Sequence, residues 1–264
     1  MPYQTIDGVR IYYHTEGSGP AVLLLHGLGS CADDWFFQFP ALSERYTVIA
    51  ADLRGHGRSD KPPGPYAIAR MGNDMAGVLA ALATGPAHVV GLSLGGLAAQ
   101  ALAIGHPPQV RSLVLVNTFA RLRPQGLGGW LYFLSRAAAM ATGGLEAQAE
   151  VVARGVFPYP EQEELRRAAA ERLRANDPAA YRATMRAVLR FDSRRDLPRV
   201  RVPALVIAGK EDTTVSLAAK QELAARIPGA QLIVMSNSGH ASPLDQPEQF
   251  NQLLLAFLAH YKEG

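Results

Sequence analysis

Short apolar runs alternate with helix-like stretches along most of this chain. The runs are of strand length and rich in Val, Leu, Ile and Ala, and the stretches between them carry apolar residues at near-helical spacing. The runs at 21–25 and 112–116 are apolar almost throughout, which is typical of strands covered on both faces. Strands that alternate with helices form parallel βαβ units. The pattern therefore predicts an α/β fold with a mostly parallel central sheet flanked by helices.

The pattern places seven strands and six helices along the chain. The expected strands are residues 9–15, 21–25, 47–51, 87–91, 112–116, 204–208 and 231–235. The expected helices are residues 67–83, 95–104, 161–175, 178–191, 217–227 and 247–261.

The alternation stops between residues 119 and 196. This segment has helix-like stretches and no convincing strand, and its glycines and prolines mark breaks between them. Loops tolerate insertions, and long inserted segments are often active-site lids. A chain of 264 residues suits one large domain with a moderate insertion. We therefore expect an inserted helical cap at 119–196 and a core domain formed by 1–118 and 197–264.

One strand-to-helix junction carries a serine between small residues. The segment Gly91-Leu92-Ser93-Leu94-Gly95-Gly96 follows an expected strand and opens an expected helix. A nucleophile elbow needs this context, because its strained turn requires small residues on both sides of the serine. The helix N-terminus directs free N–H groups and partial positive charge at the serine oxygen. A plain glycine-containing turn is the alternative, but the flanking strand and helix favour Ser93 as a nucleophile.

A histidine and an aspartate follow later strands and complete a candidate triad with Ser93. A serine hydroxyl needs an adjacent base, and the base needs an orienting group. His240 follows the last expected strand, at the same sheet edge as Ser93. Asp212 follows the strand 204–208 and lies between the other two in chain order, as this type of site requires. Glu211 competes with Asp212 for the role, whereas Asn117 and Thr118, after the preceding strand, offer no carboxylate.

The turn His26-Gly27-Leu28-Gly29 ends the strand 21–25 and supplies a candidate oxyanion hole. The backbone N–H groups of Leu28 and Leu94 are the expected donors. Two preset donors stabilise the negative oxygen of an acyl-transfer transition state, and the loss of one such donor can cost about 10²–10³ in rate. For His26 itself we expect a structural role, because the donor is a backbone group.

Five segments occur in the order found in the α/β-hydrolase superfamily. They are His26-Gly27-Leu28-Gly29, Asp52-Leu53-Arg54-Gly55-His56-Gly57-Arg58-Ser59, Gly91-Leu92-Ser93-Leu94-Gly95-Gly96, Gly209-Lys210-Glu211-Asp212 and Ser238-Gly239-His240. The resemblance covers nearly the whole chain except the expected cap. Within the superfamily the chain looks most like 3-oxoadipate enol-lactonases, cofactor-free haloperoxidase-type esterases and related carboxylesterases. The resemblance implies a serine esterase or lactonase that acts on a small molecule through an acyl-enzyme, without a cofactor.

The sequence differs from two branches of the superfamily, and two alternative functions remain open. Haloalkane dehalogenases and epoxide hydrolases of similar layout carry aspartate where this chain has Ser93, and Gly27-Leu28-Gly29 differs from the Gly-Gly-Gly loop of another lipase and esterase branch. A hydrolase of carbon–carbon bonds with a similar triad remains an alternative. So does a ligand-sensing signalling protein of the same fold, whereas the triad argues against a purely non-enzymatic interaction protein.

The expected cap is basic and contains aromatic residues. Residues 121–201 hold 15 arginines and 9 acidic residues, a formal charge of +6, whereas the whole chain carries +3. A solvated arginine-rich surface is the favoured interpretation, and attraction of a carboxylate-bearing substrate is the other. Trp130, Phe133 and Phe157, with Trp35 after the oxyanion loop, are candidates for the substrate pocket, or they pack the cap onto the core.

Other features argue against several functions. Asp52 and Arg54 are expected to hold their loop by hydrogen bonds, and the single cysteine, Cys31, is expected to be a buried bystander. No cluster has metal-ligand spacing and no loop resembles a phosphate cradle. The small net charge gives no reason to expect nucleic acid or membrane partners. The polar N-terminus and the short apolar runs predict a cytoplasmic protein, and the oligomeric state is left open.

Overall fold

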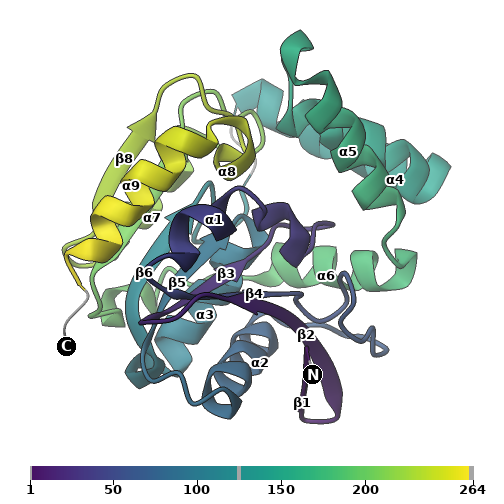
Figure 1. Cartoon of the computed structure of the whole chain (residues 1–264). Helices are drawn as coiled ribbons and strands as arrows, with labels where there is room; N and C mark the ends of the chain where they lie inside the picture. Colours follow the sequence, from purple (N-terminus) through teal and green to yellow (C-terminus); the bar gives the residue numbers. More distant parts are fainter. Residues whose placement is uncertain (1, 124–125, 262–264) are drawn as a thin grey trace.

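The computed structural model describes residues 2–123 and 126–261. Within them the chain forms an eight-stranded sheet in the order β1-β2-β4-β3-β5-β6-β7-β8 (Figure 1). Strands β1, β2 and β4 pair antiparallel, and every pairing from β4 to β8 is parallel. The strands are β1 Tyr3–Ile6, β2 Val9–Glu16, β3 Ala21–Leu25, β4 Thr47–Ala51, β5 Ala87–Leu92, β6 Val110–Val116, β7 Ala204–Gly209 and β8 Gln231–Met235.

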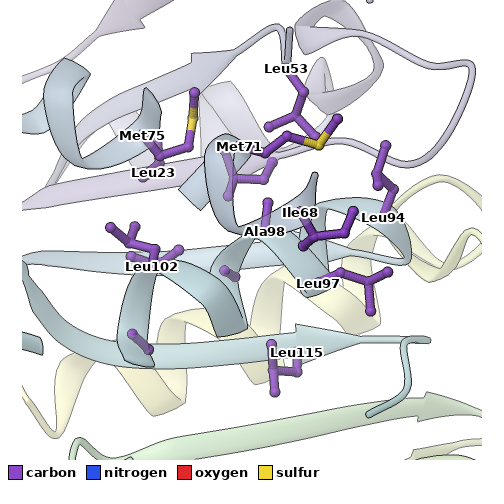
Figure 2. Close-up of a cluster of buried hydrophobic side chains, with 14 of the residues drawn as sticks. Leu23, Leu53, Ile68, Met71, Met75, Leu94, Leu97, Ala98, Leu102 and Leu115 are labelled. Carbon is purple, nitrogen blue, oxygen red and sulfur yellow. The ribbon is translucent and has the colours of Figure 1, made fainter. Parts of the chain in front are cut away.

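Helices cover both faces of this sheet. One face packs against α2 (Ile68–Ala81), α3 (Leu94–Gly105) and α7 (Leu217–Arg226). The other packs against α1 (Gln38–Ser43) and α9 (Pro247–Ala259). Successive strand residues alternate between the two cores, because side chains on a strand point to opposite faces. Leu23 and Leu115 of the sheet meet Met71 of α2 and Leu97 of α3 in one such cluster (Figure 2).

The segment between β6 and β7 contains three α-helices in its described part. They are α4 Gly126–Val156, α5 Glu163–Arg174 and α6 Pro178–Arg190. The backbone of α4 is kinked at Gly144, whose φ is 61°. Helices α4 and α5 lie side by side beyond one edge of the sheet (Figure 1). With α6 they bury a small apolar cluster of their own that includes Leu145, Leu173 and Tyr181.

The expected mostly parallel sheet, flanked by helices and interrupted by a helical insertion, is confirmed. Each expected strand is present within two residues at either end, and so is each expected helix. The insertion follows β6, but the exact division into core 1–118 with 197–264 and cap 119–196 stays a prediction. The described residues contain no helix that is both long and apolar enough to cross a membrane.

Among the strands and α-helices of the described residues, four had no range of their own in the sequence prediction: β1, α1, α4 and α8 (Ser242–Asp245). Helix α4 was expected only as part of the helix-like insertion. Strand β1 is short and half exposed, and pairs only with β2 at the edge of the sheet. Helix α1 is only six residues long and follows the 3₁₀ turn η1 (Ala32–Trp35) without a side-chain cap. Neither is long enough to show a clear period in the sequence.

Parallel strands bring four loops to one edge of the sheet. The loops after β3, β5, β7 and β8 all leave from the carboxyl ends of strands, and the strand order places β5, β6, β7 and β8 next to one another. Open α/β sheets bind ligands in the crevice beyond these strand ends. The predicted site residues follow these strands.

Candidate active site

Ser93 occupies a strained turn between β5 and α3. Its φ and ψ are 51° and −110°, a conformation that non-glycine residues rarely adopt. The backbone N–H of Ser93 donates to Val116 O at 2.9 Å, and Thr118 Oγ1 donates to Ser93 O at 2.8 Å. A side chain at position 95 would collide with the carbonyl of Leu25, so the turn requires Gly95. The junction thus has the geometry of a nucleophile elbow.

His240 and Asp212 are hydrogen-bonded to each other. His240 Nδ1 lies 2.9 Å from Asp212 Oδ2, and the ring is largely buried. Because a carboxylate only accepts, Nδ1 donates the proton of this bond, and in the neutral ring Nε2 is then the nitrogen that can accept one. Thr214 Oγ1 lies 2.6 Å from Nδ1 and donates to Asp212 Oδ1 at 2.8 Å. This arrangement fixes the orientation of the imidazole.

Asp212 is held in its ionised state. Its other oxygen, Oδ1, also accepts from the backbone N–H groups of Thr214 and Val215 at 2.8 and 3.0 Å. Burial alone would raise the pKa of this carboxyl, but His240 and Lys220 outweigh that effect and hold the pKa well below its usual range. Glu211, the competitor, instead bonds the hydroxyl of Tyr159.

Ser93 and His240 line the same cavity, which has a volume of about 170 Å³. Leu28 and Leu94, the expected oxyanion donors, also line it. A Cβ added to Gly27 would lie 3.8 Å from Ser93 Cβ, so the loop after β3 runs directly beside the serine. The structure therefore brings together all five residues predicted for the chemistry.

His26 braces the oxyanion loop from behind. Its Nε2 accepts from Leu53 N at 3.0 Å, so its Nδ1 is protonated and donates to Gly27 O at 2.7 Å. Burial lowers the pKa of His26 to about 4, which leaves the ring neutral. The imidazole has a structural role, as expected.

The remaining motif residues are also structural. Asp52 accepts from the backbone N–H groups of Ala32 and Arg58, both at 2.6 Å, and so joins its own loop to the one after β3. Arg54 forms a buried ion pair with Asp74 of α2. Burial, with nearby Asp34 and Asp52, raises the pKa of Cys31 to about 12, so the thiol stays protonated at neutral pH.

A second cavity of about 400 Å³ adjoins the first. Leu122, Met185 and Val215 line both. Among the described residues, its lining includes five arginines: Arg121, Arg123, Arg136, Arg182 and Arg186. One carboxylate, Asp212, is among these lining residues, and its charge is matched by Lys220.

The four aromatic pocket candidates have different outcomes. Trp35 and Phe157 are buried and line the first cavity. Trp130 is 50% exposed and is among the lining residues of neither cavity. The side chain of Phe133 lies outside the described residues. Trp130 is therefore a poor candidate, because the outer side of α4 faces solvent there.

A comparison with protein-family models matches residues 20–247 to the alpha/beta hydrolase fold. The chain belongs to this family. It is 36% identical over 274 residues to a protein of Caulobacter sp. strain K31 named carbamate hydrolase RutD, with 98% of each chain covered. It is 30% identical to 3-oxoadipate enol-lactonase 2 of Acinetobacter baylyi, covering 97% of this chain and 96% of the relative.

Solved α/β-hydrolase structures agree with this assignment. The crystal structure of the enol-lactonase from Burkholderia xenovorans LB400 superposes with a TM-score of 0.89 at 30% identity, covering 98% of this chain and 100% of the other. The expected resemblance to the enol-lactonase group is confirmed, and the chain is a hydrolase of this family.

Sequence reasoning missed three residues that hold this α/β-hydrolase site together. Asn117 accepts from Gly209 N at 2.7 Å, and its amide nitrogen donates to His240 O at 2.8 Å, so it ties the acid-bearing strand to the histidine loop. Thr214 bridges Asp212 and His240, and Lys220 bonds Asp212. Lys220 could have been noticed, since it sits three and four residues before the buried Leu223 and Ala224 on one helix face.

Asp245, a few residues after His240, is half buried. It accepts from Gly239 N at 2.6 Å and from Ser238 Oγ at 2.9 Å, and so fixes the turn that carries His240. Within the described residues no group of three or more His, Cys, Asp or Glu side chains is placed to hold a metal ion.

Proposed function

We propose that this protein hydrolyses a carboxylic ester or lactone of a small molecule, with Ser93 as nucleophile, His240 as base and Asp212 as the orienting acid. The observation that carries the proposal is the hydrogen bond of 2.9 Å between Asp212 and His240, because His240 lines the same cavity as the strained Ser93. Nucleophile, base and orienting group in this order are the requirements for acyl transfer by serine.

The proposed reaction assigns a role to each of the three side chains. Ser93 Oγ attacks the carbonyl carbon while His240 Nε2 takes its proton. His240 then protonates the leaving alcohol, and an acyl-enzyme remains on Ser93. A water molecule gives its proton to His240 as it attacks the acyl carbon. The bond between that carbon and Ser93 Oγ then breaks, His240 returns the proton to Ser93 Oγ, and the acid is released. Asp212 stays ionised and stabilises the imidazolium in both steps.

The oxyanion is assigned to two backbone N–H groups. Leu94 follows the nucleophile at the first position of α3, where N–H groups have no partner within the helix. Leu28 lies in the loop beside Ser93. The residue after the nucleophile and a residue from the loop after an earlier strand supply these donors in proteins of this fold.

The names of the relatives support acyl chemistry without choosing a substrate. A carbamate hydrolase and an enol-lactonase both cleave a bond between a carbonyl carbon and a heteroatom, and a triad with an oxyanion hole serves both. Among these, the ester or lactone is proposed because the cavity that Ser93 and His240 line is formed largely by apolar side chains around few polar groups.

Turnover of p-nitrophenyl esters of graded acyl length tests the proposal. Ser93→Ala should reduce kcat by at least about 10³, since the nucleophile is then absent. Ser236→Ala, at an exposed position, is the matched control and should behave as wild type. Equal activity of Ser93→Ala and wild type would refute the role of Ser93.

The same proteins separate the two alternatives. A wild type inactive on every ester but active on a dienoic ketone would indicate a carbon–carbon bond hydrolase. Very slow turnover together with ligand-dependent binding of a protein partner would indicate a ligand sensor.

A further inference from the structure

Lys220 is a fully buried lysine in contact with Asp212. It lies on α7, its side chain is 0% exposed, and its Nζ is 2.8 Å from Asp212 Oδ2. The same ammonium donates to Gly209 O at 3.2 Å, at the end of β7. Lysine is almost never fully buried unless its charge is paired. The proposed reaction uses Asp212 but gives no role to the ammonium of Lys220.

The ammonium and the imidazole share one carboxylate oxygen. Asp212 Oδ2 receives His240 Nδ1 at 2.9 Å and Lys220 Nζ at 2.8 Å, while Oδ1 is occupied by donors of Thr214 and Val215. Rotation of the carboxylate would break bonds at both oxygens. Donors on every side therefore leave Oδ2 directed at His240.

We propose that Lys220 is a positioning residue of the hydrolytic site, which fixes Asp212 toward His240 and by its charge extends toward acid the pH range in which His240 is neutral. The inference rests on the proposed function of Ser93 and His240. It adds a fourth residue, which acts through Asp212 and does not touch the substrate.

The charge effect follows from the shared oxygen. Asp212 alone would favour a proton on both nitrogens of His240, because an adjacent anion stabilises the imidazolium. Lys220 neutralises that anion, so the imidazolium forms less readily. Burial lowers the pKa of Lys220 and Asp212 opposes this, so the lysine charge itself depends on the carboxylate.

Other charged groups also face His240 and stay unchanged in the test. Asp245 of α8 (Ser242–Asp245) interacts with the ring and bonds the turn before it. Asp34 of η1 and Arg172 of α5 line the same cavity and pair with each other at 3.3 Å. Arg136 of α4 lines it too and donates to Tyr181 Oη at 2.9 Å.

Two variants and a matched control test the inference. Lys220→Met removes charge and donor, Lys220→Gln removes charge but keeps a donor, and Lys210→Met removes the same charge from an exposed neighbouring position. Protonation of His240 is followed by NMR of its ring, assigned by loss of the signal in His240→Gln. The rate at which a fluorophosphonate labels Ser93 is measured over the same pH range.

The expected results separate charge from position. In both Lys220 variants the midpoint of His240 protonation and the acid limb of labelling should move to higher pH by about one unit. The plateau rate should fall about tenfold in Lys220→Met and less in Lys220→Gln, which still anchors Asp212. Lys210→Met should leave both readouts as in wild type.

Folded Lys220 variants whose His240 midpoint and acid limb match the wild type would overturn the inference. A purely structural lysine would lower the unfolding midpoint without moving either pH readout. If Lys220→Met does not fold, Lys220→Gln carries the test. The NMR titration needs no turnover, so a wild type that fails to label at Ser93 would refute the proposed function while the midpoint still decides the coupling.

Discussion

At the scale of single residues, the site depends on one buried ion pair. Asp212 and Lys220 are both 0% exposed at their side chains. Two charges removed from water are stable only when each compensates the other, so loss of one partner is expected to be far more damaging than loss of both. This asymmetry can be measured apart from catalysis.

Asp212→Asn should lower the free energy of unfolding by about 3–5 kcal/mol, because a buried ammonium loses its counter-charge. Adding Lys220→Met should restore part of that loss, since no buried charge then remains. Urea unfolding at neutral pH of the wild type, both single variants and the double variant gives the coupling. Additive losses would contradict a compensating pair.

Three buried histidines make stability depend on pH. Burial is the main cause that lowers the pKa of His26 and His88 to about 4 and of His56 to about 3, whereas the ordinary value is 6.5. Below pH 6.5 these histidines therefore bind protons in the unfolded chain but not in the folded chain. Their contribution to stability is fully present above pH 6.5 and is lost as the pH falls toward 4.

The urea midpoint should accordingly fall as the pH is lowered through this window. His88 is the best test because it lies on β5, away from the candidate site, and its Nδ1 meets Ser112 Oγ at 2.7 Å. His88→Gln should make the decline shallower, since one proton-linked group is removed. An unchanged slope in that variant would argue against the contribution of His88.

At the scale of elements, the junction between β5 and α3 determines where the nucleophile lies. A side chain at Gly95 would meet the backbone of β3, whereas one at Gly105, at the far end of the same helix, would meet nothing within 4 Å. Gly95 is therefore required because no room exists for a side chain, whereas the space around Gly105 would accept one.

Gly95→Ala should destabilise the fold by about 1–3 kcal/mol, because the added methyl has to displace backbone. Gly105→Ala should be neutral or stabilise it by up to about 1 kcal/mol, because alanine is the better helix former. Thermal unfolding compares the two, and Ser93 labelling shows whether the elbow has shifted. Equal stabilities would mean that β3 and α3 can separate at little cost.

The hydrophobic periodicity of the sequence predicted the longer elements of the core. The strands and helices of the core were expected because their apolar residues repeat over many positions, while β1 and α1 are too short to show a repeat. Ser93, Asp212 and His240 could be placed because each follows a strand, and strand ends share an edge. Asn117 could not, because its partner Gly209 lies 92 residues away in the sequence. The position of Lys220 on the buried side of α7 could be noticed, but its contact with Asp212 depends on how α7 packs against β7.

At the scale of the whole molecule, charge is concentrated where the second cavity lies. Arg182 and Arg186 of α6 are exposed and line it, whereas Arg190 on the same helix is exposed but is not a lining residue. Arginine is suited to carboxylate recognition because its planar guanidinium offers paired donors. The basic character expected of the cap is therefore directed partly inward.

Wild type should prefer an ester whose acyl chain ends in a carboxylate over its neutral isostere. The ratio of the two kcat/KM values should fall about tenfold in Arg182→Gln/Arg186→Gln, because two nearby positive charges are lost. Arg190→Gln removes charge from the same helix and should keep the wild-type ratio. A ratio that is equal in all three proteins would leave the arginines as solvated surface.

The three side chains proposed for the chemistry follow β5, β7 and β8, and none lies on the helices between β6 and β7. Those helices instead supply walls of both cavities, including Arg136 and Met185. We therefore expect bond cleavage and part of the substrate choice to depend on different stretches of the chain. A chimaera that exchanges α4 to α6 with those of a relative should keep its reactivity toward a fluorophosphonate and adopt the donor's substrate range, which makes this segment the natural target for redesign.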